Sequence, residues 1–111
     1  MSNRTEHNKL VRDKIPEIIH NSGNQCETTT LSNLDYIEAL RNKLVEEAKE
    51  VAIANPEELA QELADVMEVI DALMTATGIE PEKVREIQEQ KQSQRGGFDN
   101  RVKLLWTELN D

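Results

Sequence analysis

Aromatic residues are nearly absent from this sequence: its 111 residues include one phenylalanine, one tryptophan and one tyrosine. Hydrophobic residues of all kinds make up only 37% of the chain. A domain of this size buries a modest share of its surface, so one copy alone would have a thin core. Association of several copies is a common remedy. We therefore expect an oligomer.

Cysteine occurs once, as Cys26, which excludes a disulfide framework within the chain. A single thiol is compatible with a reducing cytoplasm. The sequence shows no signal-peptide hydrophobic region and no apolar run long enough to span a bilayer. These absences predict a cytoplasmic protein with no membrane partner.

Basic residues are in the minority: 13 Lys and Arg stand against 22 Asp and Glu, for a net charge of −9. Nucleic-acid polymers require a basic surface, so this balance argues against such a partner. The sequence also lacks a glycine-rich phosphate loop and a Ser/His/Asp arrangement. With no evident side-chain nucleophile, any hydrolysis would depend on an activated water.

Two long amphipathic helices joined by a tight turn are predicted between Ser32 and Gly78. Ser32 is a favourable N-cap for the first helix, with Asp35 three residues later. We expect the second helix to begin at Asn55-Pro56 and to end at Gly78. Apolar residues recur at helical spacing in both. The positions at this spacing in the first helix are Leu34, Ile37, Arg41, Leu44, Ala48, Val51 and Ala52, and Leu40 and Val45 widen the stripe. The stripe of the second helix comprises Leu59, Leu63, Val66, Met67, Ile70, Leu73 and Met74.

An acidic pair lies on one flank of each stripe: Glu47 with Glu50, and Glu62 with Asp65. The members of each pair are three residues apart and therefore share a helical face. In an antiparallel hairpin Glu50 comes level with Glu62, and Glu47 with Asp65. The pattern thus predicts four carboxylates that converge at the edge of the helix–helix seam.

Carboxylates held that close raise one another's pKa unless a cation lies between them. All-oxygen ligands suit Mg²⁺, with Mn²⁺ as a substitute. In a chain with 22 acidic residues the competing interpretation is a solvated acidic helix face. Two other acids, Glu46 and Glu68, are expected to point away from the stripes into solvent.

Outside the hairpin we expect a flexible tail over residues 1–8 and a single domain over residues 9–111. A short helix should end near Asn21, residues 24–31 should form a connector or short strand, and a third helix should run from Pro81 to Gly96. Basic residues in these parts can bind substrate phosphates, or can serve only docking and the helix dipole. They are Lys9, Arg12, Lys14, Lys91 and Arg95.

The E-x-x-E, turn, E-x-x-D hairpin resembles the MazG-like, all-α nucleotide pyrophosphohydrolases. Residues 9–19 (KLVRDKIPEII) resemble the N-terminal signature of the phosphoribosyl-ATP pyrophosphohydrolase-like branch of that superfamily. The segment Lys91-x-x-x-Arg95-Gly-Gly-Phe98 resembles its C-terminal signature. The three segments in this order are strongly specific, and the likeness covers nearly the whole chain.

The resemblance implies hydrolysis of a nucleoside triphosphate to monophosphate and pyrophosphate, in the house-cleaning of non-standard nucleotides. Mg²⁺ held by the two acidic pairs would neutralise phosphate charge and activate a water, and one acid could act as general base. The five basic residues above would contact the polyphosphate. Two alternatives stay open: hydrolysis of phosphoribosyl-ATP in histidine biosynthesis, and a non-catalytic acidic helical module that binds a protein partner.

The predicted fold class is all-α: an antiparallel helical hairpin completed to a four-helix bundle by oligomerisation. The broad stripes lack cover within one copy, because the third long helix is mostly polar. We therefore expect a homodimer, or a dimer of dimers, with an acidic site in each half.

Overall fold

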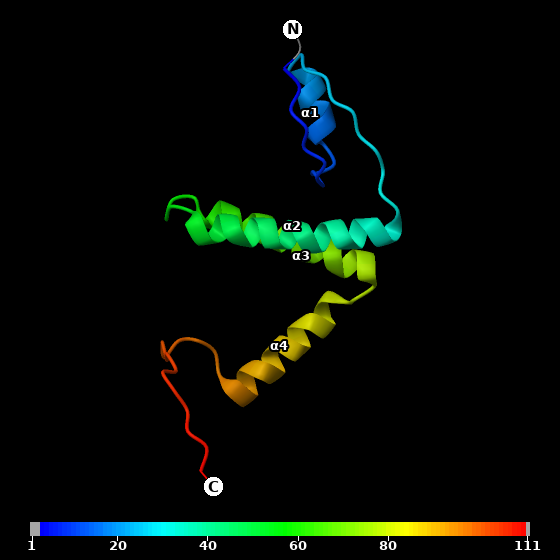
Figure 1. Cartoon of the computed structure of the whole chain (residues 1–111). Helices are drawn as coiled ribbons and strands as arrows, with labels where there is room; N and C mark the ends of the chain where they lie inside the picture. The colour runs from blue at the N-terminus through cyan, green and yellow to red at the C-terminus, as the bar shows by residue number, and fades with distance from the viewer. Residues whose placement is uncertain (1–2, 111) are drawn as a thin grey trace. The chain divides into compact units, whose positions relative to one another are not determined.

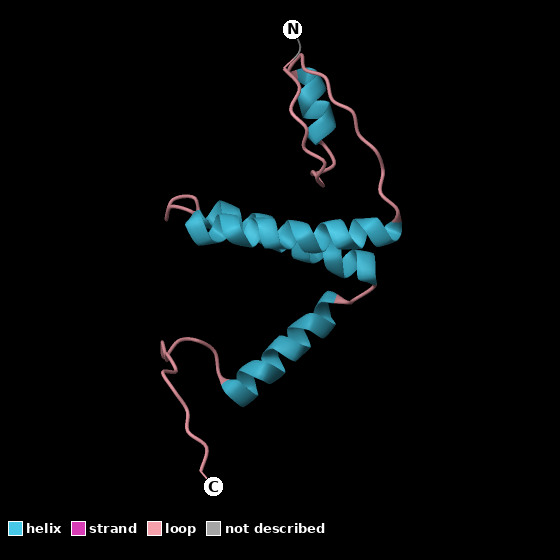
Figure 2. Ribbon diagram, viewed as in Figure 1, coloured by secondary structure: helices cyan, strands magenta, loops and turns pink. Residues whose placement is uncertain are grey.

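The computed structural model describes residues 3–110, and every regular element in that range is an α-helix (Figures 1 and 2). The helices are α1 (Ile15–Asn21), α2 (Asn33–Ile53), α3 (Leu59–Thr77) and α4 (Pro81–Arg95). The predicted all-α class is confirmed, and completion of a bundle by a second copy stays a prediction. The chain forms two compact units, one ending at Ile79 and the other beginning at Glu80.

The first long helix, α2, begins where the sequence predicted. The side-chain oxygen of Ser32 accepts a hydrogen bond from the backbone N–H of Asp35 at 3.2 Å. The backbone carbonyl of Ser32 accepts a second bond, from the N–H of Tyr36, at 2.8 Å. The first bond satisfies one of the backbone donors that every helix start leaves unpaired, and the second is the first regular bond within the helix. The N-cap assignment of Ser32 is confirmed.

The start of α3 differs from the prediction. Residues 56–58 form a turn closed by a 2.9 Å bond from the N–H of Glu58 to the carbonyl of Asn55, and the helix begins at Leu59. The predicted cap at Asn55 was therefore wrong, because this segment reverses the chain direction before the helix starts. The predicted end is confirmed: Gly78 has φ 71°, a left-handed conformation that costs glycine little.

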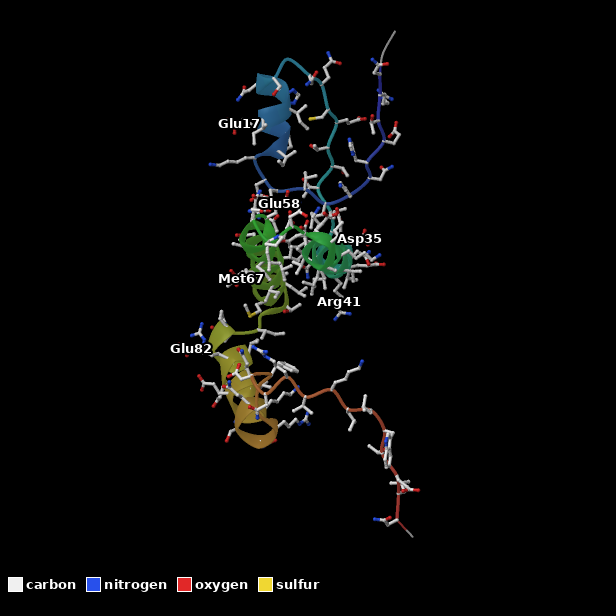
Figure 3. The ribbon with its side chains drawn as sticks, turned by 90° about the vertical axis from the view of Figure 1, so that its left-hand side faces the viewer. Glu17, Asp35, Arg41, Glu58, Met67 and Glu82 are labelled. Carbon is white, nitrogen blue, oxygen red and sulfur yellow. The ribbon has the colours of Figure 1, made fainter. Side chains whose placement is uncertain are left out.

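The seam between α2 and α3 holds the core of the first unit. The two helices lie side by side, as Figure 3 shows. Leu40 and Val69 are the most enclosed apolar residues, at 3% and 8% exposure. Val69 is outside the predicted stripe of α3, so the seam is rotated from the centre of the stripes toward the flank that carries the acids. Much of the remaining stripe stays exposed, including Met67, which lies on the outer side of α3 in Figure 3.

The other segments follow the predicted pattern. The short helix and the third long helix are present as α1 and α4, and residues 24–31 form a connector without a strand. Of the predicted flexible tail, residues 3–8 are exposed and not helical, whereas residues 1 and 2 lie outside the described range. Its flexibility and the single domain over residues 9–111 stay predictions. None of the described helices has both the length and the hydrophobicity required to cross a membrane.

Candidate active site

Three of the four predicted acids meet across the seam. One carboxylate oxygen from each of Glu47, Glu62 and Asp65 lies within 4.8 Å of the others. Glu47 comes from α2, whereas Glu62 and Asp65 come from α3, one helical turn apart. All three are half-buried. We call these three residues the acid cluster. The hairpin brings them together as the spacing predicted.

The fourth predicted acid, Glu50, is exposed and is not among these three. Its charge nevertheless acts on the cluster. Partial burial raises the pKa of Glu62, and the neighbouring carboxylates of Asp65, Glu50 and Glu47 raise it further. Such mutual repulsion favours either a proton or a cation between the acids. The assignment of Glu50 as a ligand stays a prediction.

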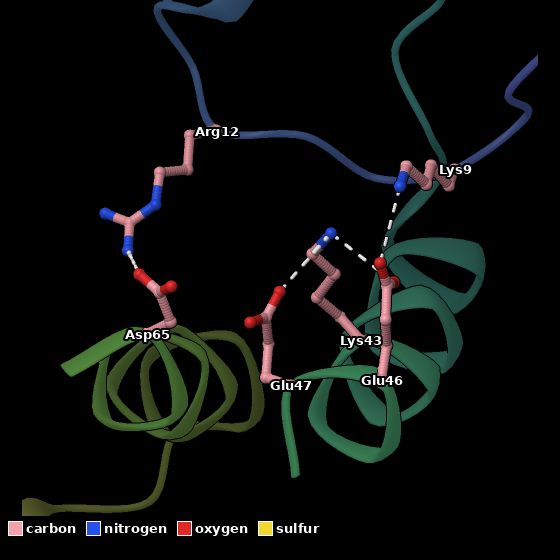
Figure 4. Close-up of polar contacts among 6 residues, drawn as sticks. All are labelled: Lys9, Arg12, Lys43, Glu46, Glu47 and Asp65. Atoms are coloured by element: carbon pink, nitrogen blue, oxygen red, sulfur yellow. Dashed lines mark hydrogen bonds and ion pairs between the residues drawn. The ribbon is translucent and has the colours of Figure 1, made fainter. Parts of the chain in front are cut away.

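Two basic side chains neutralise the acid cluster from opposite sides (Figure 4). Arg12 Nη2 lies 2.7 Å from Asp65 Oδ1, although the two residues are 53 positions apart in the chain. Lys43 Nζ lies 3.6 Å from Glu47 Oε1 on the same helix. Lys43 was absent from the predicted site. Its i, i+4 spacing to Glu47 was the signal that could have found it.

The structure corrects the predicted orientation of Glu46. Its carboxylate accepts hydrogen bonds from Lys9 Nζ and Lys43 Nζ, both at 3.4 Å, so it lies beside the site and does not point away into solvent. Partial burial acts to raise the pKa of Glu46, but Lys43 and Lys9 together lower it below its ordinary value. Glu46 lies there because the seam is rotated toward the acidic flank of α2, which brings Glu46 closer to the site than the centre of the stripe predicted. Glu68 is exposed, as predicted, but it also lines the groove described next and so does not simply point away from the site.

A groove of about 640 Å³ runs between the N-terminal segment and the α2–α3 seam. Its volume falls within the usual range for small-molecule sites. Tyr36, Leu40, Lys43 and Glu47 lie on successive turns of one face of α2 and all line it. The groove therefore has an apolar end near Tyr36 and a charged end at Glu47 and Asp65, two of the three residues of the acid cluster.

The predicted phosphate-binding residues divide between the two units. Lys9, Arg12 and Lys14 line the groove. Lys91 and Arg95 lie on α4 in the second unit, so their part in the site stays a prediction.

The acid cluster fits a divalent cation. Mg²⁺ takes oxygen ligands at about 2.0–2.1 Å in octahedral geometry, which places neighbouring ligand oxygens about 3–4 Å apart. The oxygens of Glu47, Glu62 and Asp65 lie within 4.8 Å of one another, which is close to that spacing. Partial burial and the neighbouring carboxylates together raise the pKa of Glu62, so its ionised form is disfavoured there, and a bound cation would favour it.

A family model described as phosphoribosyl-ATP pyrophosphohydrolase matches residues 9–92. The matched range begins at the N-terminal segment, includes the whole hairpin and ends within α4. No curated protein and no solved structure was found to match the chain. Proteins of the matched family are metal-dependent nucleotide pyrophosphohydrolases of the MazG-like superfamily, so the match favours an enzyme over a non-catalytic binding module.

Proposed function

Because this chain belongs to the phosphoribosyl-ATP pyrophosphohydrolase family, we propose that it is a Mg²⁺-dependent nucleoside triphosphate pyrophosphohydrolase. The reaction is cleavage between the α and β phosphates, which releases a nucleoside monophosphate and pyrophosphate. The role is the removal of non-standard nucleotides. The observation that carries the proposal is the acid cluster of Glu47, Glu62 and Asp65, two members of which, Glu47 and Asp65, line a groove.

The proposed ligands of the cation are Glu47, Glu62 and Asp65, with Glu50 as a fourth. A divalent cation bound there supplies charge neutralisation and an activated water. The carboxylates themselves hold that water in line and offer a proton acceptor, since one of them can serve as general base. Mn²⁺ shares the preference for oxygen ligands and should substitute for Mg²⁺.

The basic residues of the groove are proposed to bind the polyphosphate. Lys9, Arg12 and Lys14 line it beside the acid cluster, where each can donate charge-assisted hydrogen bonds to phosphate oxygens. We assign the same role to Lys91 and Arg95 because they are spaced i, i+4 on one face of α4. With a net charge of −9, the chain needs such local cations to attract an anionic substrate.

A second substrate, phosphoribosyl-ATP of histidine biosynthesis, is favoured by the description of the matching family. Both substrates carry the same triphosphate, so the acid cluster does not discriminate between them. The distinction has to come from the groups that bind the base and sugars.

We also propose that the active form is a cytoplasmic homodimer, or a dimer of dimers, without a nucleic-acid or membrane partner. Stripe residues remain exposed in the single copy, among them Leu63 at 46% and Met67 at 63%. A second hairpin packed on this face would complete a four-helix core.

An activity screen tests the proposal directly. The protein is incubated with Mg²⁺ and a panel of standard and non-standard nucleoside triphosphates plus phosphoribosyl-ATP, and pyrophosphate and the nucleotide product are both measured. We expect pyrophosphate release that stops with chelator and returns with Mg²⁺ or Mn²⁺. Preference for phosphoribosyl-ATP would replace the house-cleaning role with the histidine pathway. No release from any nucleotide would refute the proposed activity.

A further inference from the structure

Lys43 is the most enclosed basic group at the acid cluster. Its side chain is 18% exposed, against 49% for Lys9 and 58% for Arg12. Its partner Glu47 is the most enclosed acid of these ion pairs, at 14%. Lysine is rarely enclosed unless it is paired, because its ammonium group loses hydration. The enclosure therefore indicates a fixed contact, in contrast to the more exposed pairs made by the N-terminal segment.

Local helix energetics do not account for this pair. In isolated helices the favourable order places Glu four residues before Lys, whereas here Lys43 precedes Glu47. Instead, Lys43 is held from a second side, because Glu46 lies one helical turn away and accepts from the same ammonium at 3.4 Å. Glu46 is fixed in turn by Lys9 at 3.4 Å. Lys43 thus lies within a chain of ion pairs that leads to Glu47.

The contact leaves Glu47 able to bind a cation. Lys43 approaches the Oε1 atom of that carboxylate, and an ionised carboxylate offers two oxygens with about four acceptor positions. One carboxylate can therefore form the ion pair with Lys43 and still present an oxygen to the acid cluster. Partners outside the ligand shell orient the ligating side chains in metal sites.

We propose that Lys43 is a positioning residue that holds the carboxylate of Glu47 turned into the acid cluster, ready to ligate the divalent cation. This inference rests on the proposed metal-dependent function. The positioning role and the positive charge of Lys43 predict opposite changes in metal affinity when Lys43 is removed. A nearby cation repels a divalent ion, so removal of Lys43 for its charge alone would tighten metal binding. Removal of a positioning contact weakens it.

The sign of the change in Mn²⁺ affinity decides between the two effects. Free Mn²⁺ is titrated by electron paramagnetic resonance against the intact wild-type chain, Lys43→Gln and Lys43→Arg, without nucleotide. We expect Lys43→Gln to bind Mn²⁺ about tenfold more weakly, the lower end of the range for lost partners of metal ligands. Lys43→Arg keeps a donor within reach of Glu47 and should recover most of the affinity. Lys49→Gln, a loss of the same charge from an exposed position on α2, is the matched control and should bind as the wild type does.

The outcomes separate this inference from the proposed function. Unchanged or tighter Mn²⁺ binding by Lys43→Gln, with a wild-type thermal midpoint, overturns the positioning role and leaves the enzyme assignment intact. Equal weakening in Lys49→Gln overturns it as well, because the loss of affinity would then not depend on the contact with Glu47. A wild-type chain that binds no Mn²⁺ overturns both. If Lys43→Gln fails to fold, Lys43→Met carries the test, since methionine keeps the apolar stem of the side chain and removes only the ammonium contact. The positioning role predicts weaker Mn²⁺ binding by this variant, and unchanged or tighter binding overturns it.

Discussion

Replacement of Met67 by glutamate should dissociate the proposed dimer. Met67 lies on the outer side of α3 and is 63% exposed in a single copy. Full burial of a methionine side chain contributes about 1.5–3 kcal/mol, so burial of the exposed share contributes roughly 1–2 kcal/mol per copy. In a symmetric dimer both copies contribute, which gives roughly 2–4 kcal/mol.

This magnitude sets the expected change in affinity. Since about 1.4 kcal/mol corresponds to a factor of ten, the dissociation constant should rise about 30- to 1,000-fold. Two buried glutamates would add a further penalty. Methionine and glutamate have similar helix propensity, so α3 itself should remain folded. Sedimentation at micromolar concentration measures the dissociation constant of the dimer, and circular dichroism checks that helicity is retained.

The control is Ile18→Glu, a matched exchange on α1 at a residue that is 55% exposed and outside both stripes. It should leave the dimer intact. A wild-type chain that sediments as an active monomer at micromolar concentration would refute the reasoning. If wild type and Met67→Glu dimerise equally well, the association uses another face.

Three further changes probe the acid cluster and the core. Asp65→Asn should reduce pyrophosphate release by several orders of magnitude with helicity intact, whereas Glu68→Gln should be nearly silent; similar losses in both would contradict the predicted geometry. In chelator, Glu62→Gln should raise the thermal midpoint at pH 7, because the raised pKa of Glu62 means that its ionised form costs the folded state free energy. That gain should shrink as pH falls through the raised pKa, since wild-type Glu62 then takes up a proton, and melts at pH 7 and at pH 4, below the ordinary pKa of a glutamate, test the sign. Leu40→Ala should lower the free energy of unfolding by about 2–5 kcal/mol in urea denaturation, because this side chain is 3% exposed; a loss below about 0.5 kcal/mol would show that the seam is not the core.

The local features of the fold were predictable because they depend on neighbours in the chain. The cap at Ser32 and the end at Gly78 each involve only a few adjacent residues. The turn before α3 was predicted less well. There Asn55 closes a turn in place of capping the helix, a choice set by the reversal that brings α3 back against α2.

The meeting of Glu47 with Glu62 and Asp65 was also predictable, because the rise and period of an α-helix fix the register of an antiparallel hairpin once its turn is known. The rotation of each helix about its own axis was not predictable from the sequence. A broad apolar stripe gives the same sequence pattern whichever of its edges packs against the partner helix. Only the tertiary structure decided that rotation, and with it the burial of Val69 and the contacts of Glu46. It also placed Arg12 against Asp65, because no local rule relates residues that are 53 positions apart.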